Sequence, residues 1–167
     1  MQFLTAKTLI YARITILTAV SYFFVKDPTF ITSSGFVMLL GQAMQVQFAK
    51  VDPTNPLLGF VGVILFTFAL CDLIPILAEN LDYFDSLVPT RLAFYFALCA
   101  YTYFAKQSIV SNSLVFTYSF LEIWLNFLIY NNLRDEKYYR MKKFIEEHSD
   151  EIRAAQDEQV TIIKTDD

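Results

Sequence analysis

The stretch LCDLIPILAENLDYFDSLVPTRL, residues 70–92, organises this chain because it lies between two apolar runs suited to lipid. It carries four acidic residues and one basic residue: Asp72, Glu79, Asp82, Asp85 and Arg91. Two prolines interrupt it, and proline disfavours an uninterrupted helix. We interpret its middle as an acidic hinge that keeps two membrane spans antiparallel. Four of its charges, Glu79, Asp82, Asp85 and Arg91, also form a candidate docking surface for a partner.

The composition on both sides of this hinge is that of a membrane protein. Hydrophobic residues make up 55% of the chain and aromatic residues 17%, against roughly 45–50% apolar residues in soluble domains. A chain of 167 residues has room for a small bundle of spans of ~20 residues each and one tail. A separate soluble catalytic domain is thereby excluded.

The apolar runs predict four spans, at residues 8–25, 57–77, 87–105 and 114–133. Residues 30–49 carry no charge but hold three glutamines, whose amides would need internal partners in lipid. This favours a re-entrant or interfacial helix there, and a fifth span stays open as the alternative. The predicted fold class is therefore all-α: a polytopic membrane helical bundle of about four transmembrane helices with an extra re-entrant or interfacial helix and a cytosolic helical tail.

The distribution of basic residues predicts the domains and the orientation. Residues 1–133 form the bundle, and residues 134–167 form a charged tail that begins with five basic residues: Arg134, Lys137, Arg140, Lys142 and Lys143. The positive-inside rule puts this cluster in the cytosol. Four spans then put the N-terminus in the cytosol too, whereas a fifth would move it across the membrane. The tail is either a solvated helix or a helix that binds anionic lipid.

Ionisable residues within the spans should face protein or water and have a partner. At ~1.5 Å per residue from the cytosolic edges, Arg13, Asp72 and Asn126 come out about 9–12 Å deep. We therefore predict a buried polar layer of these three residues, with Arg91 as a competing partner for Asp72 or Glu79.

Glu122 comes out about 18 Å deep by the same count, with no obvious cation at its level. We expect it to be protonated, because burial disfavours the charged form, or to hydrogen-bond to a glutamine of residues 30–49. The layer as a whole has three interpretations: a structural element that fixes helix packing, a ligand or ion site, or an acid/base pair of Asp72 and Glu122.

Several kinds of chemistry find little support in the residues. The two cysteines lie within apolar runs, and the chain has one histidine, so we expect no metal site and no cofactor. Charges gather in the hinge and the tail rather than on a basic face, so we expect no nucleic-acid partner.

Three segments carry a resemblance to a known family: DLIPILAENLDYFDSLVPTRL (72–92), FLEIWLNFLIYNNLRDEK (120–137) and LLGQAM (39–44). In this order they resemble the fungal family called increased loss of mitochondrial DNA protein 1. The resemblance covers most of the chain up to about residue 137. It implies a small multi-span protein of the endoplasmic reticulum linked to mitochondrial genome maintenance, and it names no catalytic residues.

These observations lead to one functional hypothesis and two alternatives. We expect a non-enzymatic accessory or adaptor protein of the endoplasmic-reticulum membrane, whose partners are the lipid bilayer and other membrane proteins. The first alternative is a lipid- or sterol-binding bundle in which Asp72, Glu122 and Asn126 line a pocket. The second is an isomerase-like enzyme that uses Asp72 and Glu122. The link to mitochondrial DNA would be indirect, through membrane lipid supply or protein assembly.

Overall fold

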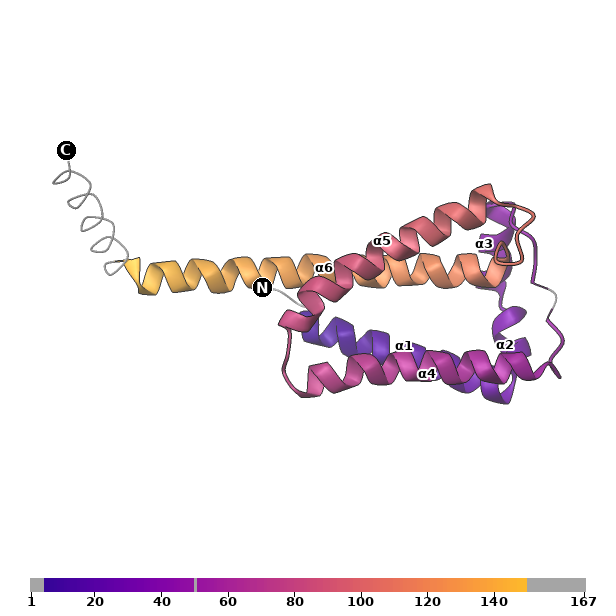
Figure 1. The fold of residues 1–167 in the computed structure, drawn as a ribbon, viewed down its shortest axis with the longest axis horizontal. Helices are drawn as coiled ribbons and strands as arrows, with labels where there is room; N and C mark the ends of the chain where they lie inside the picture. Colours follow the sequence, from indigo (N-terminus) through magenta and orange to yellow (C-terminus); the bar gives the residue numbers. More distant parts are fainter. Residues whose placement is uncertain (1–4, 50, 150–167) are drawn as a thin grey trace, which may run out of the picture.

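The computed structural model describes residues 5–49 and 51–149 of the chain, and these form an all-helical fold, as predicted (Figure 1). The helices are α1 (Ala6–Lys26), α2 (Pro28–Thr32), α3 (Gly35–Ala43), α4 (Pro56–Leu77), α5 (Asp82–Phe104) and α6 (Ser113–Glu147). Outside the helices, the described residues contain one isolated β-bridge, between Gln47 and Asn112.

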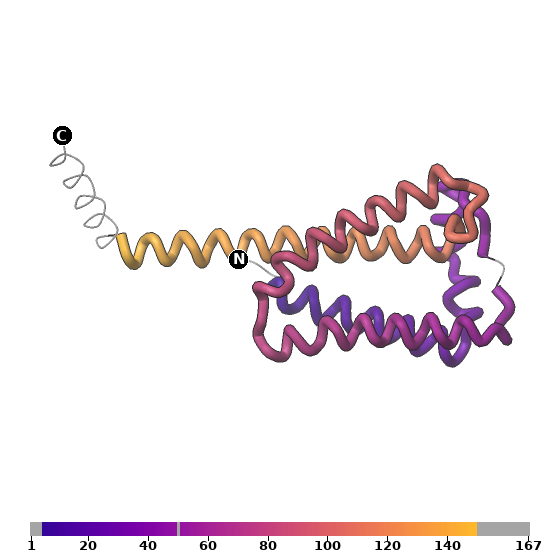
Figure 2. Tube along the Cα trace, in the orientation of Figure 1, coloured from indigo at the N-terminus to yellow at the C-terminus, as the bar shows by residue number. Residues whose placement is uncertain are grey.

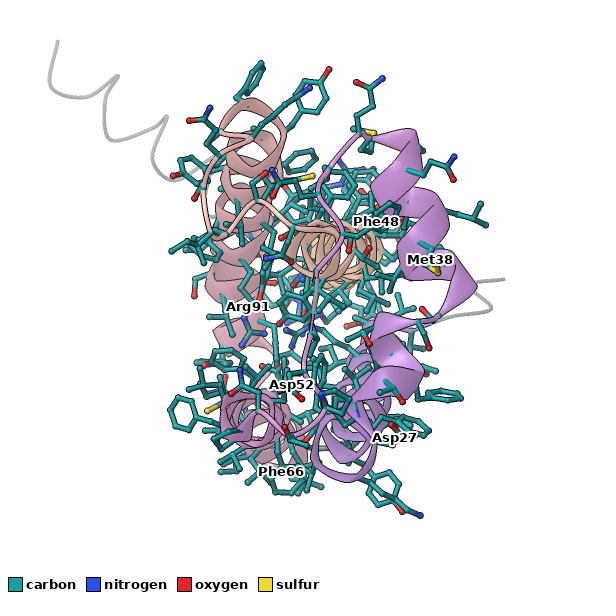
Figure 3. The ribbon with its side chains drawn as sticks, turned by 90° about the vertical axis from the view of Figure 1, so that its right-hand side faces the viewer. Asp27, Met38, Phe48, Asp52, Phe66 and Arg91 are labelled. Atoms are coloured by element: carbon teal, nitrogen blue, oxygen red, sulfur yellow. The ribbon has the colours of Figure 1, made fainter. Side chains whose placement is uncertain are left out.

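The four long helices form two layers. α1 packs along α4 in one layer and α5 packs along α6 in the other, and α1 also contacts α6 across the layers (Figures 1 and 2). At one end of the bundle α3 packs against α6. Figure 3 views this end, where α6 is seen end-on between α5 and α3. α6 is therefore the helix that connects the parts of the bundle.

Side-chain caps explain where most helices begin. A side-chain oxygen accepts a hydrogen bond from the first turn of α1, α2, α3, α4 and α6; the capping residues are Thr5, Asp27, Ser34, Asn55 and Asn112. Such caps satisfy amide groups that the helix leaves without partners. Proline follows two of the caps, where its missing N–H does no harm.

Three of the described helices, α1, α4 and α6, are long and apolar enough to cross a membrane. α5 is as long, with 23 residues, but charged residues at its start lower its apolarity. In the segment 30–49 the structure has short helices, and the longest, α3, has 9 residues. At ~1.5 Å per residue α3 cannot cross a hydrocarbon core of about 30 Å, so a fifth span through this segment is excluded.

The acidic hinge is shorter than predicted. α5 begins at Asp82 rather than at residue 87, so Asp82 and Asp85 lie in its first turn. Negative charge is favourable there, because the N-terminus of a helix carries partial positive charge. Pro89 consequently lies inside α5 and not in its first turn. The predicted start was wrong because it began the helix where the apolar run begins.

The turn itself is a left-handed helix end. Glu79 has φ of 56°, and the amide of Asn80 donates to the carbonyl of Pro75 at 3.0 Å. This is the pattern by which helices commonly terminate, usually with glycine at the left-handed position. It turns the chain from α4 into α5.

A glycine sets the distance between α1 and α4. The hydroxyl of Ser21 on α1 donates to the carbonyl of Gly62 on α4 at 2.7 Å. A Cβ at Gly62 would lie 2.9 Å from Val25 Cγ2 and 3.1 Å from the Ser21 carbonyl oxygen, whereas a Cβ at Gly59 would meet nothing within 4 Å. Small residues that allow close backbone approach are typical of helix contacts in membranes.

The bundle is apolar outside and partly charged inside. Large hydrophobic side chains on the outer faces of α4, α5 and α6 are exposed, among them Leu57, Phe60, Val63, Ile74, Phe94, Phe96, Trp124 and Phe127. Within residues 5–49 and 51–149, four buried side chains are charged or carry an amide: Arg13, Asp72, Glu122 and Asn126. Soluble proteins rarely expose apolar surface on this scale, so the distribution agrees with a lipid environment.

The predicted division at residue 133 falls inside a helix. α6 has 35 residues and continues to Glu147, so bundle and tail differ in exposure and composition rather than in secondary structure. Beyond residue 133 it exposes large side chains, including Tyr138, Met141, Phe144 and Ile145. The rest of the predicted tail, residues 150–167, lies outside the described residues.

Candidate functional site

Arg13 is the centre of the charged interior. It points inward from α1, and its side chain is 2% exposed. Its Nε donates to Glu122 Oε2 at 3.0 Å and its Nη2 donates to Glu122 Oε1 at 2.9 Å. The remaining Nη1 donates to Asp72 Oδ2. Paired N–H···O bonds between a guanidinium and a carboxylate combine charge with fixed geometry, so Arg13 connects α1 to both α6 and α4.

Asp72 has a second arginine on its other side. Arg91 of α5 donates from Nη1 to Asp72 Oδ2 at 3.0 Å, and its Nη2 lies 2.8 Å from Asp72 Oδ1. Figure 3 shows Arg91 on α5, directed toward α4. Of the two partners predicted for Arg91, the structure therefore selects Asp72. The Arg91 side chain is 18% exposed and is engaged by Asp72.

Asn126 completes the cluster from α6. Its Nδ2 donates to Glu122 Oε2 at 2.8 Å and to the Glu122 carbonyl at 2.7 Å. The structure thus pairs Arg13 with Asp72, whereas the described hydrogen bonds of Asn126 go to Glu122 rather than to those two residues.

The expectation that Glu122 lacks a cation is wrong, because Arg13 binds both of its carboxylate oxygens. The depth count treated each residue as a point on its helix. An arginine side chain is long and carries its donors at the far end, so Arg13 reaches a carboxylate that the count placed several ångströms deeper.

We call Arg13, Asp72, Arg91, Glu122 and Asn126 the polar network. It takes a residue from each of the four long helices, and its two arginines balance its two carboxylates. Removing one partner of a buried ion pair leaves an uncompensated charge, which is strongly unfavourable. The network therefore joins the four long helices through charged contacts.

The hinge residues also pair within the chain. Glu79 lies 3.1 Å from Lys7 Nζ, and Asp85 lies 2.8 Å from Lys137 Nζ. The hydrogen bond from Lys137 to the Asp85 carboxylate, together with the attraction between the charges, raises the pKa of Lys137. Asp82 is exposed. Three of the four charges predicted as a docking surface, those of Glu79, Asp85 and Arg91, therefore have partners within this chain.

A cavity of about 1000 Å³ separates the two layers. It lies between α1, α4 and α6, and the α3 end borders one side of it. Most of its lining is aliphatic or aromatic, including Leu17, Leu65, Phe68, Leu121 and Leu125. Glu122 lines it where it approaches the polar network, together with Thr117 and Tyr118.

Thr117 and Tyr118 were not among the predicted site residues. Their spacing from Glu122 was the available signal, because residues four apart lie on one face of a helix and Tyr118 precedes Glu122 by four. The Tyr118 hydroxyl lies 3.1 Å from that of Tyr95 on α5, so Tyr118 is already engaged. The hydroxyl groups of Thr117 and Tyr118 thus lie beside the predicted polar layer, and the charged residues alone did not indicate them.

The arrangement does not favour the acid/base pair. Glu122 lines the cavity, but the described lining residues do not include Asp72, so the two carboxyls do not face one ligand. Within the described residues there is also no group of three or more histidine, cysteine, aspartate or glutamate side chains that could hold a metal ion.

Fold and site together define the class: a small all-α bundle in which three of the described helices can cross a membrane, with a charged interior. Within that class, the chain belongs to the family described as increased loss of mitochondrial DNA protein 1, whose family model matches residues 4–143. The resemblance found in the sequence is thereby confirmed.

Two curated relatives agree with this assignment. Protein ILM1 of Saccharomyces cerevisiae is 32% identical over 143 residues, which cover 85% of this chain and 70% of the relative. Protein ilm1 of Schizosaccharomyces pombe is 32% identical over 127 residues, covering 74% of this chain and 79% of the relative. No solved structure matches the chain.

Proposed function

We propose that this chain is a non-enzymatic, multi-span protein of the endoplasmic-reticulum membrane that holds the apolar part of a membrane lipid in its interior cavity. The cavity between the layers is the observation that carries the proposal. It moves lipid binding ahead of the adaptor function that the sequence favoured.

The size of the cavity argues for an occupant. Its volume of about 1000 Å³ lies at the upper end of the range of ligand sites, roughly 300–1,000 Å³. Its lining is mainly apolar, and several lining side chains are exposed at the surface of the bundle, so lipid can reach it. Apolar cavities do not favour water, so a surrounding lipid is the natural occupant.

The proposed orientation puts both the start of α1 and the basic part of α6 in the cytosol. The Ala6 amide donates to Glu136 Oε1 at 2.8 Å, so these two segments lie at the same end of the bundle. This contact supports an even number of crossings, and we propose α5 as the fourth. The five basic residues that begin at Arg134 support the cytosolic side.

Glycosylation reporters test this topology. We expect an acceptor sequence inserted at residue 53, between α3 and α4, to be glycosylated, and one inserted at residue 80 to stay unmodified. The turn at residue 80 lies at the cytosolic end and the segment at residue 53 at the opposite end. Glycosylation at residue 80, or at both sites, would contradict the four-crossing arrangement.

The family description concerns loss of mitochondrial DNA. A membrane bundle that binds lipid would influence the mitochondrial genome indirectly, through the lipids supplied to mitochondrial membranes. A direct role would need a positively charged surface for the phosphate backbone. The interior charges cancel instead, and the basic residues gather after residue 133.

Blocking the cavity tests the proposed function. Leu121 lines the cavity from α6, and Leu121→Trp would fill part of it. We expect the purified wild type to retain lipid in near-stoichiometric amount and the variant to lose most of it, as measured by mass spectrometry of the protein in mild detergent. In a yeast strain that depends on the protein, the variant should also lose mitochondrial DNA more often.

Phe127→Trp is the matched control, because Phe127 is on the same helix, is 49% exposed and faces outward. It adds the same indole to the lipid-facing surface and should retain lipid like the wild type. Equal lipid retention by Leu121→Trp and Phe127→Trp, or a wild type without bound lipid, would contradict the proposal.

An adaptor function is the second candidate. Its support is the part of α6 beyond residue 133, which exposes Tyr138, Met141, Phe144 and Ile145 away from the bundle. Exposed apolar side chains on a projecting helix are typical of protein contacts. A stoichiometric protein partner that co-purifies with the wild type and is lost from Met141→Glu, but not from Leu121→Trp, would favour this function over lipid binding.

A further inference from the structure

One buried hydroxyl in the cavity wall stands apart from the others. Thr117 is 4% exposed and lines the cavity from α6, and its Oγ1 has no hydrogen-bond partner among the described residues. Other buried hydroxyls of the described bundle have hydrogen-bond partners. The hydroxyls of Ser21, Thr102, Ser111 and Ser119 donate to the carbonyls of Gly62, Cys99, Thr102 and Val115, and that of Ser113 accepts from the Ala49 amide.

A buried hydroxyl without a partner is unfavourable by about 1–3 kcal/mol. Threonine in a helix can bond back to the carbonyl four residues earlier, and Thr117 does not do so. Its hydroxyl is therefore held available to whatever occupies the cavity. A ligand that brings one hydrogen-bonding group would satisfy it.

The charges near Thr117 limit which group that is. Glu122 lines the same cavity, but Oε1 binds Arg13 Nη2, and Oε2 binds both Arg13 Nε and Asn126 Nδ2. The guanidinium of Arg13 is likewise shared between two carboxylates. A cationic or phosphorylated head group would have to break these pairs, so a neutral group fits better.

Most polar residues at the other end of the cavity are engaged within the chain, and Gln47 is exposed. Ser34 and Asn112 cap helices, and Ser111 donates to the Thr102 carbonyl at 2.5 Å. The rest of the lining is mainly apolar. The cavity thus matches a largely apolar molecule with few hydrogen-bonding atoms.

We infer that the ligand is a neutral lipid whose polar group is a hydroxyl, and that the Thr117 hydroxyl binds this group beside Tyr118. The inference rests on the proposed function, because it names the class of lipid that the cavity takes. Sterols and diacylglycerols share the required chemistry: an apolar body, no charge and one free hydroxyl.

The test compares each lipid with an analogue that lacks the free hydroxyl. The full chain in mild detergent is titrated with tritiated cholesterol and cholest-5-ene, with 1,2-dioleoylglycerol and its acetylated form, and with dioleoyl phosphatidic acid. We expect cholesterol or dioleoylglycerol to bind more tightly than its analogue and than phosphatidic acid. Whether cholesterol or dioleoylglycerol binds then shows whether the hydroxyl belongs to a sterol or to a diacylglycerol.

The variant Thr117→Val then replaces the hydroxyl group of Thr117 with a methyl group and keeps nearly the same side-chain shape. We expect affinity for the hydroxyl lipid to fall about two- to tenfold, the range of one net hydrogen bond, and affinity for the analogue to stay unchanged. The variant should fold normally, since it loses no hydrogen bond within the chain. Thr102→Val is the matched control, because Thr102 is buried but its hydroxyl binds the Cys99 carbonyl; it should leave binding of every lipid unchanged.

The inference would be overturned if Thr117→Val lost affinity equally for the hydroxyl lipid and its analogue, or lost affinity for neither. It would also be overturned if phosphatidic acid bound more tightly than the hydroxyl lipids. The comparison of lipid with analogue in the wild type decides the matter even without the variant. If Leu121→Trp abolishes lipid binding while Thr117→Val changes nothing, only this inference fails. If Leu121→Trp binds every lipid as the wild type does, the proposed function fails as well.

Discussion

Replacing Arg13 by glutamine is expected to destabilise the bundle more than any other single substitution in its interior. The change leaves Glu122 with Asn126 as its described partner and gives the interior a net negative charge. Breaking a buried ion pair in this way costs about 3–5 kcal/mol. For a chain of this length that lowers the thermal midpoint by roughly 6–20 °C, measurable by heating the purified protein in detergent, and it should also lower abundance in the membrane.

Neutralising the orphaned partner should restore part of the loss. In the double variant Arg13→Gln with Glu122→Gln, the remaining pair of Asp72 and Arg91 is neutral overall. We therefore expect a favourable coupling of about 0.5–3 kcal/mol between the two substitutions. Arg134→Gln is the control, since Arg134 is 66% exposed and its described ion-pair contact, with Asp135, is 3.8 Å long. If Arg13→Gln and Arg134→Gln had the same thermal midpoint, the network would not stabilise the bundle. The same conclusion would follow if the effects of Arg13→Gln and Glu122→Gln were additive.

Replacing Gly62 by valine is expected to have the second largest effect. Its Cβ would press on Val25 and on the Ser21 backbone, and the hydrogen bond from Ser21 to the Gly62 carbonyl would lengthen. Overpacking costs about 1–3 kcal/mol and a lost hydrogen bond about 1 kcal/mol, so we expect a loss of about 2–4 kcal/mol. The measurement is the thermal midpoint in detergent.

Gly59→Val is the matched control on the same helix. A side chain there meets open space, so its midpoint should stay close to that of the wild type. Val25 is 62% exposed, and Val25→Ala should relieve part of the effect of a milder Gly62→Ala variant. If Gly59→Val and Gly62→Val were equally stable, the close contact of α1 and α4 would not depend on glycine.

Local patterns in the sequence predicted the helices well but not all of their ends. The apolar runs located α1, α4, α5 and α6, because hydrophobic length alone identifies a segment that can cross a membrane. The start of α5 was missed by five residues, because Asp82 and Asp85 stabilise a helix end as well as they would suit a loop. Charge alone therefore could not separate hinge from helix.

For the candidate site, too, the sequence predicted some features and not others. The rarity of charges within apolar runs singled out Arg13, Asp72, Glu122 and Asn126. Their partners depend on how far each side chain reaches and on how the helices rotate, which a depth count does not contain. For that reason Arg13 was paired with Asp72 but not with Glu122, and for Arg91 two partners, Asp72 and Glu79, and a docking surface stayed open.

The sequence by itself determined the class of this protein: apolar runs long enough for lipid, with a few interior charges that need partners. The tertiary structure alone decided the network that joins all four long helices, the close contact at Gly62 and the cavity lined by Thr117. These features arise between helices that are distant in the chain. A cavity is the space that packing leaves, so no single segment encodes it.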